Sequence, residues 1–406
     1  MLTYDYTARD PVSGRHVKAG VQADSESSAA KLIRAEGLVP IDIKVSKNGS
    51  GFFASRFNRV KTKDKVLFSR QLSTLLNAGL PLLQSLRSVN SQTTSKPFRI
   101  VISVIISDVE GGSTLAAAMG RHADVFNQVY LSLIAAGEAS GTLDAALERL
   151  ANQQEKDADI LSKIKGAMIY PLIILVVMGV VVAFMLVKVL PQVKQLYTET
   201  SGGSLPMITQ VLLAISDFMI KYWWLIIIVA AVIAIFTSRW VRTLGGKTII
   251  DKVKMRAWPF GSLFMKLYMA RFSRTATTLI ASGVPLLQVL EITAKAIDNV
   301  HISDSLHAAI EKVKGGKALG DALEGDPNFL ELVPNMLKIG EQSGSLDQML
   351  SKAADYYEKE LDQEIKNIQT LIEPVMMIVM GIVAFTIVAA VLLPIYSLAG
   401  QSGNVV

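Results

Sequence analysis

The strongest constraint on the fold of this chain is an internal repeat. The nineteen residues from Phe68 to Leu86 return as Phe272 to Leu290, with eleven identical positions at a constant offset of 204 (272 − 68). A second motif, Gly137 to Asp144, returns as Gly340 to Asp347 at an offset of 203 (340 − 137). Self-similarity over this distance means that one structural unit occurs twice, so each copy constrains the interpretation of the other.

The repeated motifs supply the candidate residues for a structural or partner-docking role. The first copy contributes Phe68, Arg70, Gly79, Pro81, Gly137, Glu138, Ser140, Gly141, Leu143 and Asp144. The second copy contributes Phe272, Arg274, Gly283, Pro285, Gly340, Glu341, Ser343, Gly344, Leu346 and Asp347.

Within each copy the residue spacing is typical of short helices. The apolar residues from Phe68 to Leu76 recur on one face of a helix. Gly79 followed by Pro81 indicates a helix end and a new start, because glycine accepts positive φ and proline fits a first helical turn. Thr142 and Ser345 are placed to cap the helices that follow them. We expect each copy to be a compact bundle of about six short helices.

Two acidic residues, Glu138 and Glu341, recur inside the second motif. The arginines Arg70 and Arg274 recur inside the first motif. We expect each glutamate to pair with the arginine of its own copy in a structural clasp. Partner binding is the alternative role for these acids, followed by catalysis or metal ligation.

Three uncharged apolar segments are long enough to cross a membrane. They run from Ala167 to Val187, from Tyr222 to Ser238 and from Pro374 to Tyr396, and the chain as a whole is 50% hydrophobic. At ~1.5 Å per helical residue, about twenty residues cover the ~30 Å hydrocarbon core of a bilayer. A fully buried core helix could explain one such segment, but three of them indicate an integral membrane protein.

The repeat also explains the number of spans. Pro171 and Pro191 pair with Pro374 and Pro394, so the first and third spans belong to the two copies and the second has no counterpart. If both copies lie on the same side of the membrane, one return crossing is needed between them. The second span supplies that crossing.

The distribution of basic residues predicts the orientation of the chain. Three lysines between Lys156 and Lys165 precede the first span, and six basic residues between Arg239 and Arg256 follow the second. The loop between these spans has few, and the tail after Pro374 has none. Basic residues accumulate on the cytoplasmic side, so both bundles should be cytoplasmic and the loop and the C-terminus should lie outside. The N-terminus has no basic segment followed by an apolar core, which predicts that it too is cytoplasmic.

The N-terminal residues differ from the repeats in pattern. Leu2 to Thr7 and His16 to Val21 read as two strands, Ser27 to Glu36 as a helix, and Ile41 to Val45 as a third strand. A linker centred on Asn48 to Gly51 follows.

Together these patterns predict a mainly α protein with two homologous cytoplasmic helical bundles, three transmembrane helices and a small α/β N-terminal unit. The expected boundaries are 1–46 for the N-terminal unit, 47–62 for the linker, 63–166 for bundle 1, 167–190 for the first transmembrane helix, 191–220 for an external loop, 221–238 for the second transmembrane helix, 239–268 for a cytoplasmic connector, 269–370 for bundle 2, 371–396 for the third transmembrane helix and 397–406 for an external tail.

A search for catalytic or cofactor motifs finds none. The chain has no cysteine, so thiolate catalysis and cysteine metal sites are excluded. The two glycine-lysine pairs, at Gly246 and Gly316, lack the earlier glycine of a phosphate-binding loop. The closest two of the four histidines, His301 and His307, are six residues apart and lie on different helix faces. We therefore predict no enzyme, no metal and no cofactor.

Two charge patterns remain open to more than one interpretation. The acids Glu155, Asp157 and Asp159 could hold a calcium ion, although a solvated helix face is the simpler interpretation. The net charge of +6 could indicate nucleic acid or a membrane surface. Because many basic residues lie beside apolar segments, we favour the membrane.

The two motif pairs and the three-span order resemble the type II secretion F / type IV pilus assembly PilC family. The residues that carry the resemblance are Phe-Ser-Arg with Gly-x-Pro-Leu-Leu-Gln-x-Leu, and Gly-Glu-x-Ser-Gly-x-Leu-Asp, each present twice. The resemblance covers nearly the whole chain. It implies a multi-pass platform protein of the cytoplasmic (inner) membrane, without enzymatic activity.

The same resemblance implies a set of partners. They are a cytoplasmic hexameric assembly ATPase and in some systems a retraction ATPase, pilins or pseudopilins, other inner-membrane assembly proteins, the lipid bilayer and further copies of the chain. It leaves open whether the machine builds pili, takes up DNA or secretes protein. The alternative is an oligomeric transporter or channel component, which the duplication alone would also permit.

Overall fold

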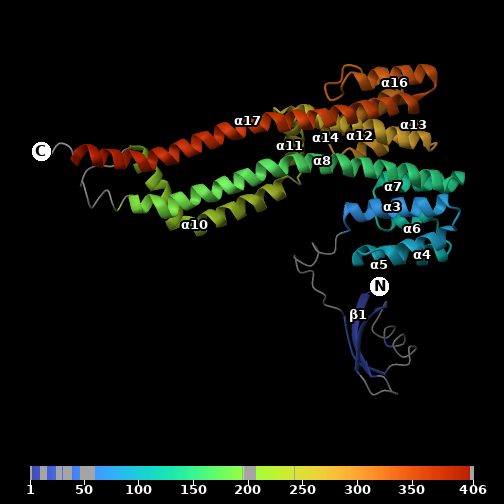
Figure 1. Cartoon of the computed structure of the whole chain (residues 1–406). Coiled ribbons are helices and arrows are strands. Elements are labelled where there is room, and N and C mark those ends of the chain that lie inside the picture. The colour runs from blue at the N-terminus through green and yellow to red at the C-terminus, as the bar shows by residue number, and fades with distance from the viewer. Residues whose placement is uncertain are drawn as a thin grey trace. The chain divides into compact units, whose positions relative to one another are not determined.

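The computed structural model describes residues 2–9, 16–23, 30, 39–45, 60–193, 195, 207–241 and 243–402 (Figure 1). The chain divides into two compact units, which we describe separately. The first comprises residues 1–61 with 94–100, and the second comprises residues 62–93 with 101–406. The second unit contains nearly all of both repeats and all of the apolar spans.

The N-terminal unit contains a three-stranded antiparallel sheet. Strands β1 (Leu2–Arg9), β2 (His16–Ala23) and β3 (Val39–Val45) are arranged in the order β2-β1-β3. They lie where the alternating pattern predicts strands. The expected helix at Ser27–Glu36 falls outside the described residues except at position 30, and the linker at Asn48–Gly51 falls outside them entirely. The α/β character of this unit as a whole therefore stays a prediction.

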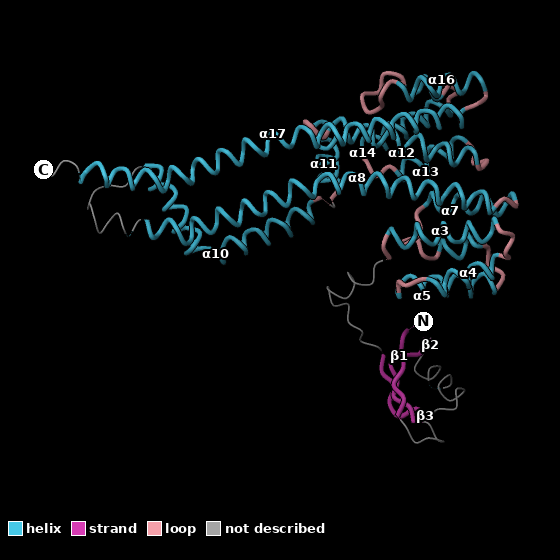
Figure 2. The backbone as a smooth tube through the Cα atoms, in the orientation of Figure 1, coloured by secondary structure: helices cyan, strands magenta, loops and turns pink. Residues whose placement is uncertain are grey.

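Each repeat folds into six helices, as the sequence predicts. Bundle 1 consists of α3 (Thr62–Asn77), α4 (Leu82–Gln92), α5 (Lys96–Glu110), α6 (Leu115–Gly120), α7 (Gln128–Ser140) and α8 (Leu143–Phe184). Bundle 2 consists of α12 (Gly261–Ala281), α13 (Leu286–Ala296), α14 (Val300–Lys314), α15 (Leu319–Leu323), α16 (Leu332–Ser343) and α17 (Leu346–Ser402). Figure 2 shows this almost wholly helical path.

The turns between the first two helices of each bundle follow the repeated glycine and proline. Gly79 and Gly283 have φ of 82° and 83°, the left-handed region where a side chain is strained. Pro81 and Pro285, with φ of −57° and −56°, immediately precede α4 and α13. The same turn therefore occurs at the same place in both copies.

The helices after the second motif begin at Leu143 and Leu346 as predicted, but not through the predicted caps. The Thr142 hydroxyl makes no capping hydrogen bond. It pairs instead with the Ser140 hydroxyl at 2.7 Å, and Ser345 pairs with Ser343 at 2.6 Å. The hydroxyls are drawn back toward the preceding helix because Gly141 and Gly344 turn the chain with φ of 71° and 66°.

An aromatic pair lies in the core of each bundle. Phe68 is buried and its ring lies 6.3 Å from that of Phe126. Phe272 is also buried and its ring lies 5.3 Å from that of Phe329. Phe126 and Phe329 are repeat equivalents at the offset of 203 (329 − 126). Both cores are therefore built around the phenylalanine that opens the first motif.

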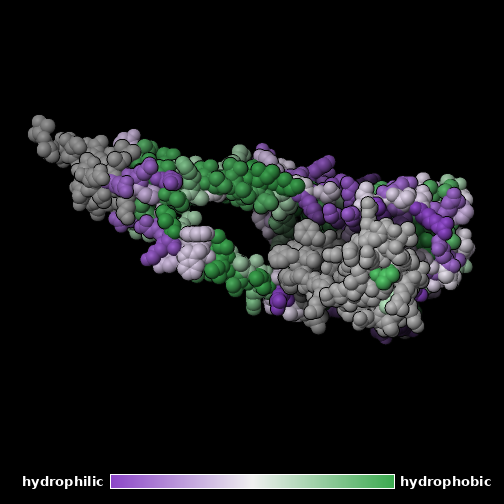
Figure 3. All heavy atoms as spheres, turned by 90° about the horizontal axis from the view of Figure 1, so that it is seen from below, coloured by the Kyte–Doolittle hydropathy of each residue, from purple (hydrophilic) through white to green (hydrophobic). Residues whose placement is uncertain are grey.

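Among the described residues, three helical segments are long and apolar enough to cross a membrane: Leu143–Val193, Thr209–Trp240 and Leu346–Leu393. The first and third continue directly from the last helix of each bundle, and α8 passes into a π-helical turn, η1 (Met185–Val189). Figure 3 shows apolar side chains along these segments and polar ones over the bundles. This is the arrangement expected when a bundle and its exit helix are copied together.

The helix that contains the second span is longer than the predicted span. Helix α10 (Met207–Trp240) begins in what the sequence suggested to be an external loop, and it is kinked at Tyr222, where φ is −116°. The sequence predicts a span that starts only at Tyr222, because the charged residues Asp217 and Lys221 precede the uncharged run. Leu213, one turn before Asp217, is buried against Leu186, Leu190 and Ala390 of the other two spans, and this packing extends the helix.

The connector before bundle 2 is predicted from the sequence only by its bounds, 239–268. It contains a helix, α11 (Leu244–Arg256), and α12 begins at Gly261, eight residues before the predicted boundary (269 − 261). Helix α11 packs against α12 and α14. It holds the start of α14, because the Asp251 carboxylate accepts a hydrogen bond from the Val300 backbone N–H at 3.1 Å.

Candidate functional site

The repeated glutamates lie at helix N-termini and not beside the repeated arginines. Both carboxylate oxygens of Glu138 accept backbone hydrogen bonds, from Leu115 at 2.5 Å and Ala116 at 2.9 Å. Glu341 does the same with Leu319 at 2.6 Å and Gly320 at 2.9 Å. We call these two carboxylates the helix anchors.

The helix anchors overturn the predicted clasp between these glutamates and the arginines. The first N–H groups of any helix have no partner within that helix, and its N-terminus carries partial positive charge. The short helices α6 and α15 begin close to Glu138 and Glu341, so a bidentate carboxylate satisfies two such groups at once. Sequence reasoning did not find this role because it gave no weight to the helix starts at Leu115 and Leu319.

The glycine before each helix anchor allows two helices to approach closely. A Cβ on Gly137 would lie 2.7 Å from the Ala146 Cβ, and one on Gly340 would lie 2.9 Å from the Leu346 Cα. Contacts this short do not occur without displacement, so the last turns of α7 and α16 approach α8 and α17 only because these positions are glycine. The second motif is therefore a structural joint between the last two helices of each bundle.

The repeated arginines bind acids on the exit helices. Arg70 of α3 donates from Nε and Nη2 to the two carboxylate oxygens of Glu155 on α8, at 2.6 and 2.5 Å. The hydrogen bond from Arg70 lowers the pKa of Glu155, although partial burial opposes the shift. Arg274 of α12 donates from Nε to one carboxylate oxygen of Glu358 on α17, Oε1, at 2.8 Å, and its Nη2 lies 2.8 Å from the same oxygen.

Each arginine also has a second partner on the exit helix. Arg70 donates to the Asn152 Oδ1 at 2.6 Å, and Arg274 to the Asp355 Oδ1 at 2.5 Å. Burial alone would lower the pKa of Arg274, but hydrogen bonds to Asp355 and Glu358 raise it on balance. The partners recur at the offset of 203 (358 − 155 and 355 − 152), and extending the repeat alignment past Asp144 would have revealed them.

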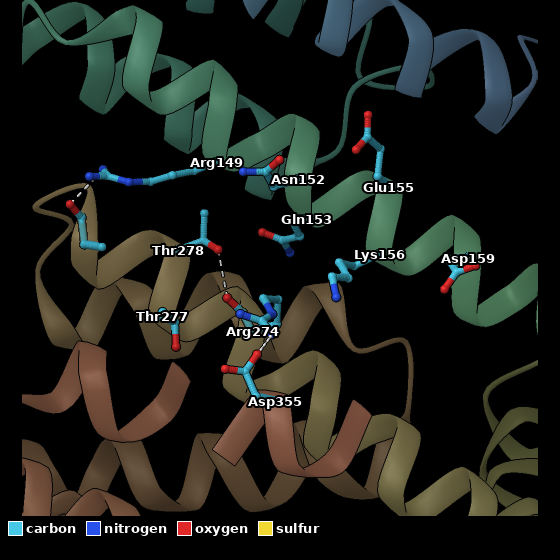
Figure 4. Close-up of a pocket in the computed structure, with 11 residues that line it drawn as sticks. Arg149, Asn152, Gln153, Glu155, Lys156, Asp159, Arg274, Thr277, Thr278 and Asp355 are labelled. Atoms are coloured by element: carbon cyan, nitrogen blue, oxygen red, sulfur yellow. Dashed lines mark hydrogen bonds and ion pairs between the residues drawn. The ribbon is translucent and has the colours of Figure 1, made fainter. Parts of the chain in front are cut away.

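The two bundles meet along α8, and the contact contains a polar cavity of about 610 Å³ (Figure 4). Arg149 reaches from α8 to the end of α12, where its Nη1 donates to the Ala281 carbonyl at 2.8 Å. The buried Gln153 donates from Nε2 to the Thr275 Oγ1 at 2.9 Å. The cavity is lined by residues of α8, α12 and α17.

An ionisable group lies beside this contact on α8. Burial raises the pKa of Asp157, opposed by Arg271 and Arg274 and reinforced by Glu358. The neighbouring acids Glu155 and Asp159 are engaged by Arg70 and Lys163. Among the described residues, no group of three or more His, Asp or Glu side chains could hold a metal ion. The acids that had suggested a calcium ion therefore point to different neighbours.

The ends of α5 and α14, just before the repeated Gly-Gly pairs, differ in charge between the bundles. In bundle 1 this tip carries Asp108 and Glu110, which pair with Arg121 at 2.7 Å and Arg87 at 2.6 Å. In bundle 2 the equivalent residues are Lys312 and Lys314 (offset 204), followed by Lys317, and all three are exposed. We call Lys312, Lys314 and Lys317 the basic tip.

The basic tip lies at the end of bundle 2 that is remote from the spans. The start of α14 is held by α11, which directly follows α10. Its end lies by α15, since the Lys312 Nζ donates to the Ala322 carbonyl at 3.1 Å. The start of α15 is in turn bonded to Glu341, which lies shortly before the start of α17. The apolar part of α17 lies toward the other end of that helix.

Comparison with known proteins agrees with this architecture. A family model described as "Type II secretion system (T2SS), protein F" matches residues 68–191 and again 272–394. A second model, "Type II secretion system protein F, N-terminal domain", matches residues 1–44. The two matches of the first model each comprise one bundle with its exit helix.

Relatives from both pilus and secretion systems align over nearly the whole chain. The type IV pilus assembly protein PilC of Thermus thermophilus is 39% identical over 98% of this chain and 99% of its own length. PilC of Pseudomonas aeruginosa is 34% identical over 92% of this chain and 98% of its own. The type II secretion system protein F of Pseudomonas aeruginosa is 34% identical over 98% of this chain and 99% of its own.

Proposed function

Because this chain belongs to the type II secretion system protein F family, a family of structural components of pilus and secretion machines, we propose that it is the inner-membrane platform of such a machine. In this proposal it couples a cytoplasmic hexameric ATPase to the extraction and polymerisation of pilins or pseudopilins. It acts as a docking surface, without catalysis of its own.

The observation that carries the proposal is the direct continuity of bundle and span. Helices α8 and α17 each run without interruption from a helical bundle into an apolar segment. The helix anchors and the arginine pairs tie the other helices of each bundle to these two. A force applied to either bundle would therefore reach the membrane through a rigid helix, as coupling to a motor requires.

Orientation is part of the proposal. Basic residues concentrate before the first span and after the second, which supports cytoplasmic bundles and an external C-terminus. In that orientation the basic tip is the part of bundle 2 farthest into the cytoplasm. We propose that it contacts an acidic surface of the ATPase, while the tip of bundle 1, whose acids are already paired, does not.

Charge reversal at the basic tip tests this contact. Lys314 and Lys317 are suitable because both are exposed, and the ion pair that Lys314 makes within the described part of the chain is with the nearby Glu311 at 3.0 Å. Lys312 is left unchanged because it bonds the α15 backbone. We expect Lys314→Glu with Lys317→Glu to reduce co-purification of the ATPase several-fold and to reduce the number of pili or the amount of secreted substrate.

The matched control is Lys295→Glu, an exposed lysine on α13 at the end nearer the spans. It should leave both readouts unchanged. Normal ATPase recovery from the tip variant would refute the docking site. Unchanged pilus number and secretion after deletion of the whole chain would refute the platform role.

A further inference from the structure

The contact between the two bundles is head-to-tail. Helix α8 of bundle 1 packs against α12 and α17 of bundle 2, and α7 packs against α12 and α13. Apart from the α8–α17 pair, which is its own equivalent, the repeat equivalents of these pairs would be α17 with α3 and α16 with α3 and α4. These equivalent pairs have no comparable packing among the helices that the structure describes. The two bundles therefore contribute different faces, and the helix pairs that would bring the equivalent faces together do not form within the molecule.

The face that bundle 1 contributes is a stripe along α8, which we call the inserting stripe. Arg149 bonds the end of α12, and Gln153 bonds Thr275. Further along, Lys156 pairs with Glu358 at 3.4 Å and Lys163 with Asp362 at 2.8 Å. Since these numbers increase together, α8 and α17 run in the same direction, as Figure 1 also shows.

An equivalent stripe on α17 is exposed. At the offset of 203, its residues are Lys352, Tyr356, Lys359 and Lys366 in place of Arg149, Gln153, Lys156 and Lys163. All three lysines are exposed, and none makes an ion pair within residues 60–193, 207–241 and 243–402. Tyr356 is 49% exposed, whereas its equivalent Gln153 is buried. We call these four residues the second stripe.

The face that would receive the second stripe lies on α3 and α8 of bundle 1. Asn77 and Ala78 at the end of α3 correspond to Ala281 and Ser282, and Gln71 corresponds to Thr275. Glu155 corresponds to Glu358, and Asp159 corresponds to Asp362. Asn77, Ala78 and Asp159 are exposed, whereas Gln71 and Glu155 are half-buried, and the two acids also line the cavity between the bundles. We call these residues the receiving face.

We propose that the second stripe of one copy of this chain docks on the receiving face of a second copy, repeating between molecules the contact that joins the two bundles within one. Lys352 meets the end of α3, Tyr356 meets Gln71, Lys359 meets Glu155 and Lys366 meets Asp159. The partner is thus a second copy of the chain. Its bundle 1 carries the repeat equivalent of the bundle 2 face that binds the inserting stripe.

Charge complementarity supports this occupant. Every cation of the inserting stripe has a cation at the same place in the second stripe, and both acids that receive it have an acid at the same place in bundle 1. The position of Arg271 is taken by Leu67, which is 51% exposed one turn before Gln71. Tyr356 and Leu67 together add apolar area that the internal contact lacks at these positions.

Membrane geometry permits the same operation to be repeated. Because α8 and α17 run in the same direction, a second copy placed by the same rotation keeps all of its spans parallel to those of the first. A head-to-tail contact of this kind closes into a ring or extends further, depending on its angle. The proposal rests on the proposed platform role only in placing both copies in one membrane. A negative cross-linking result would leave the proposed ATPase docking site untouched.

Site-directed cross-linking tests the proposal cleanly because the chain has no cysteine of its own. The variant carries Gln71→Cys and Tyr356→Cys in the full-length protein, in native membranes, treated with a short reagent that joins two thiols. We expect covalent dimers and higher species. Co-expressed single variants, one with each change, should also give dimers, which shows that the link joins two molecules.

Three controls make the result decisive. Either single variant alone should give no dimer, because a head-to-tail contact never brings two identical positions together. Gln153→Cys with Thr275→Cys should give an intramolecular link in the monomer, since these side chains are bonded within one chain. Gln71→Cys with Asp304→Cys, an exposed residue of α14, should give none.

Absence of dimers from the Gln71 and Tyr356 pair, with the internal pair still linking, would overturn the proposal. Efficient dimers from either single variant would overturn it in favour of a symmetric contact between like faces. Adding Lys359→Glu and Lys366→Glu to the double-cysteine variant should lower the dimer yield several-fold. An unchanged yield would contradict the assigned ion pairs.

Discussion

Bundle 1 and bundle 2 are built on the same joints but differ in the charge of their tips. The helix anchors have nearly the same geometry, with bond lengths of 2.5 and 2.9 Å in one copy and 2.6 and 2.9 Å in the other. The tips, in contrast, carry paired acids in bundle 1 and exposed lysines in bundle 2. The recurring motif residues therefore stabilise the fold, whereas the proposed docking surface consists of residues that do not recur.

The arginine pairs show an intermediate case. In bundle 2 the side chains of Arg274 and Glu358 are 20% and 12% exposed, and Asp355 adds a second carboxylate. In bundle 1 those of Arg70 and Glu155 are 35% and 42% exposed, and the second partner is the neutral Asn152. The link between the arginine and the exit helix is therefore less exposed to solvent in bundle 2 and involves one more charged group. Bundle 1 covers that part of bundle 2, while its own equivalent face stays open.

Removal of the helix anchors should have the largest effect and should be equal in both bundles. Glu138→Ala and Glu341→Ala each leave two backbone donors without their charged acceptor, and we expect a loss of about 3 kcal/mol of stability for each. Hydrogen exchange of the amides at Leu115, Ala116, Leu319 and Gly320 in the full-length protein measures it. A clearly smaller loss in one bundle would show that the joints are not equivalent.

Adding a methyl group at the joints should have the next largest effect. Gly137→Ala and Gly340→Ala force apart helices that approach within 2.7 and 2.9 Å of the added carbon. Overpacking of this kind costs about 1–3 kcal/mol. Thermal unfolding of the purified protein checks this. Gly166→Ala is the matched control, because nothing lies within 4 Å of a Cβ there and the helix should gain slightly.

A double-mutant cycle on the arginine pairs should show the smallest effect and the clearest difference between bundles. The Arg70–Glu155 pair is open to solvent on both sides, so its coupling should be about 0.2–1 kcal/mol. The Arg274–Glu358 pair is less exposed, and we expect its coupling to be larger, about 1–3 kcal/mol. Equal couplings would contradict the difference in burial as its cause.

Acid provides a second measure of the pair in bundle 1. Arg70 lowers the folded-state pKa of Glu155 below its usual 4.5. The coupling is therefore fully present above pH 4.5 and is lost as the pH falls through the lowered folded-state value. Unfolding curves at pH 6 and at successively lower pH should show this loss in the unmodified protein, and Glu155→Gln should abolish that part of it.

Much of the architecture was predictable from local patterns. The repeat register, the six helices of each bundle, the turns at Gly79 and Gly283 and the number of spans all follow from spacing and composition. The start of α10 did not follow, because Asp217 and Lys221 look like the edge of a span. The residues that make the earlier turns helical, such as Leu213, do so through contacts with the other two spans.

The partners of the recurring charges were the least predictable. The sequence by itself determined that a bundle and its exit helix occur twice and that a third span separates them, because periodicity and hydrophobic length are properties of consecutive residues. Only the tertiary structure decided that Glu138 binds a helix N-terminus, that Arg70 binds Glu155, and that the two bundles meet through unlike faces. Each of these depends on which groups distant in sequence lie within hydrogen-bonding distance, and a repeat in sequence does not specify how its two copies pack.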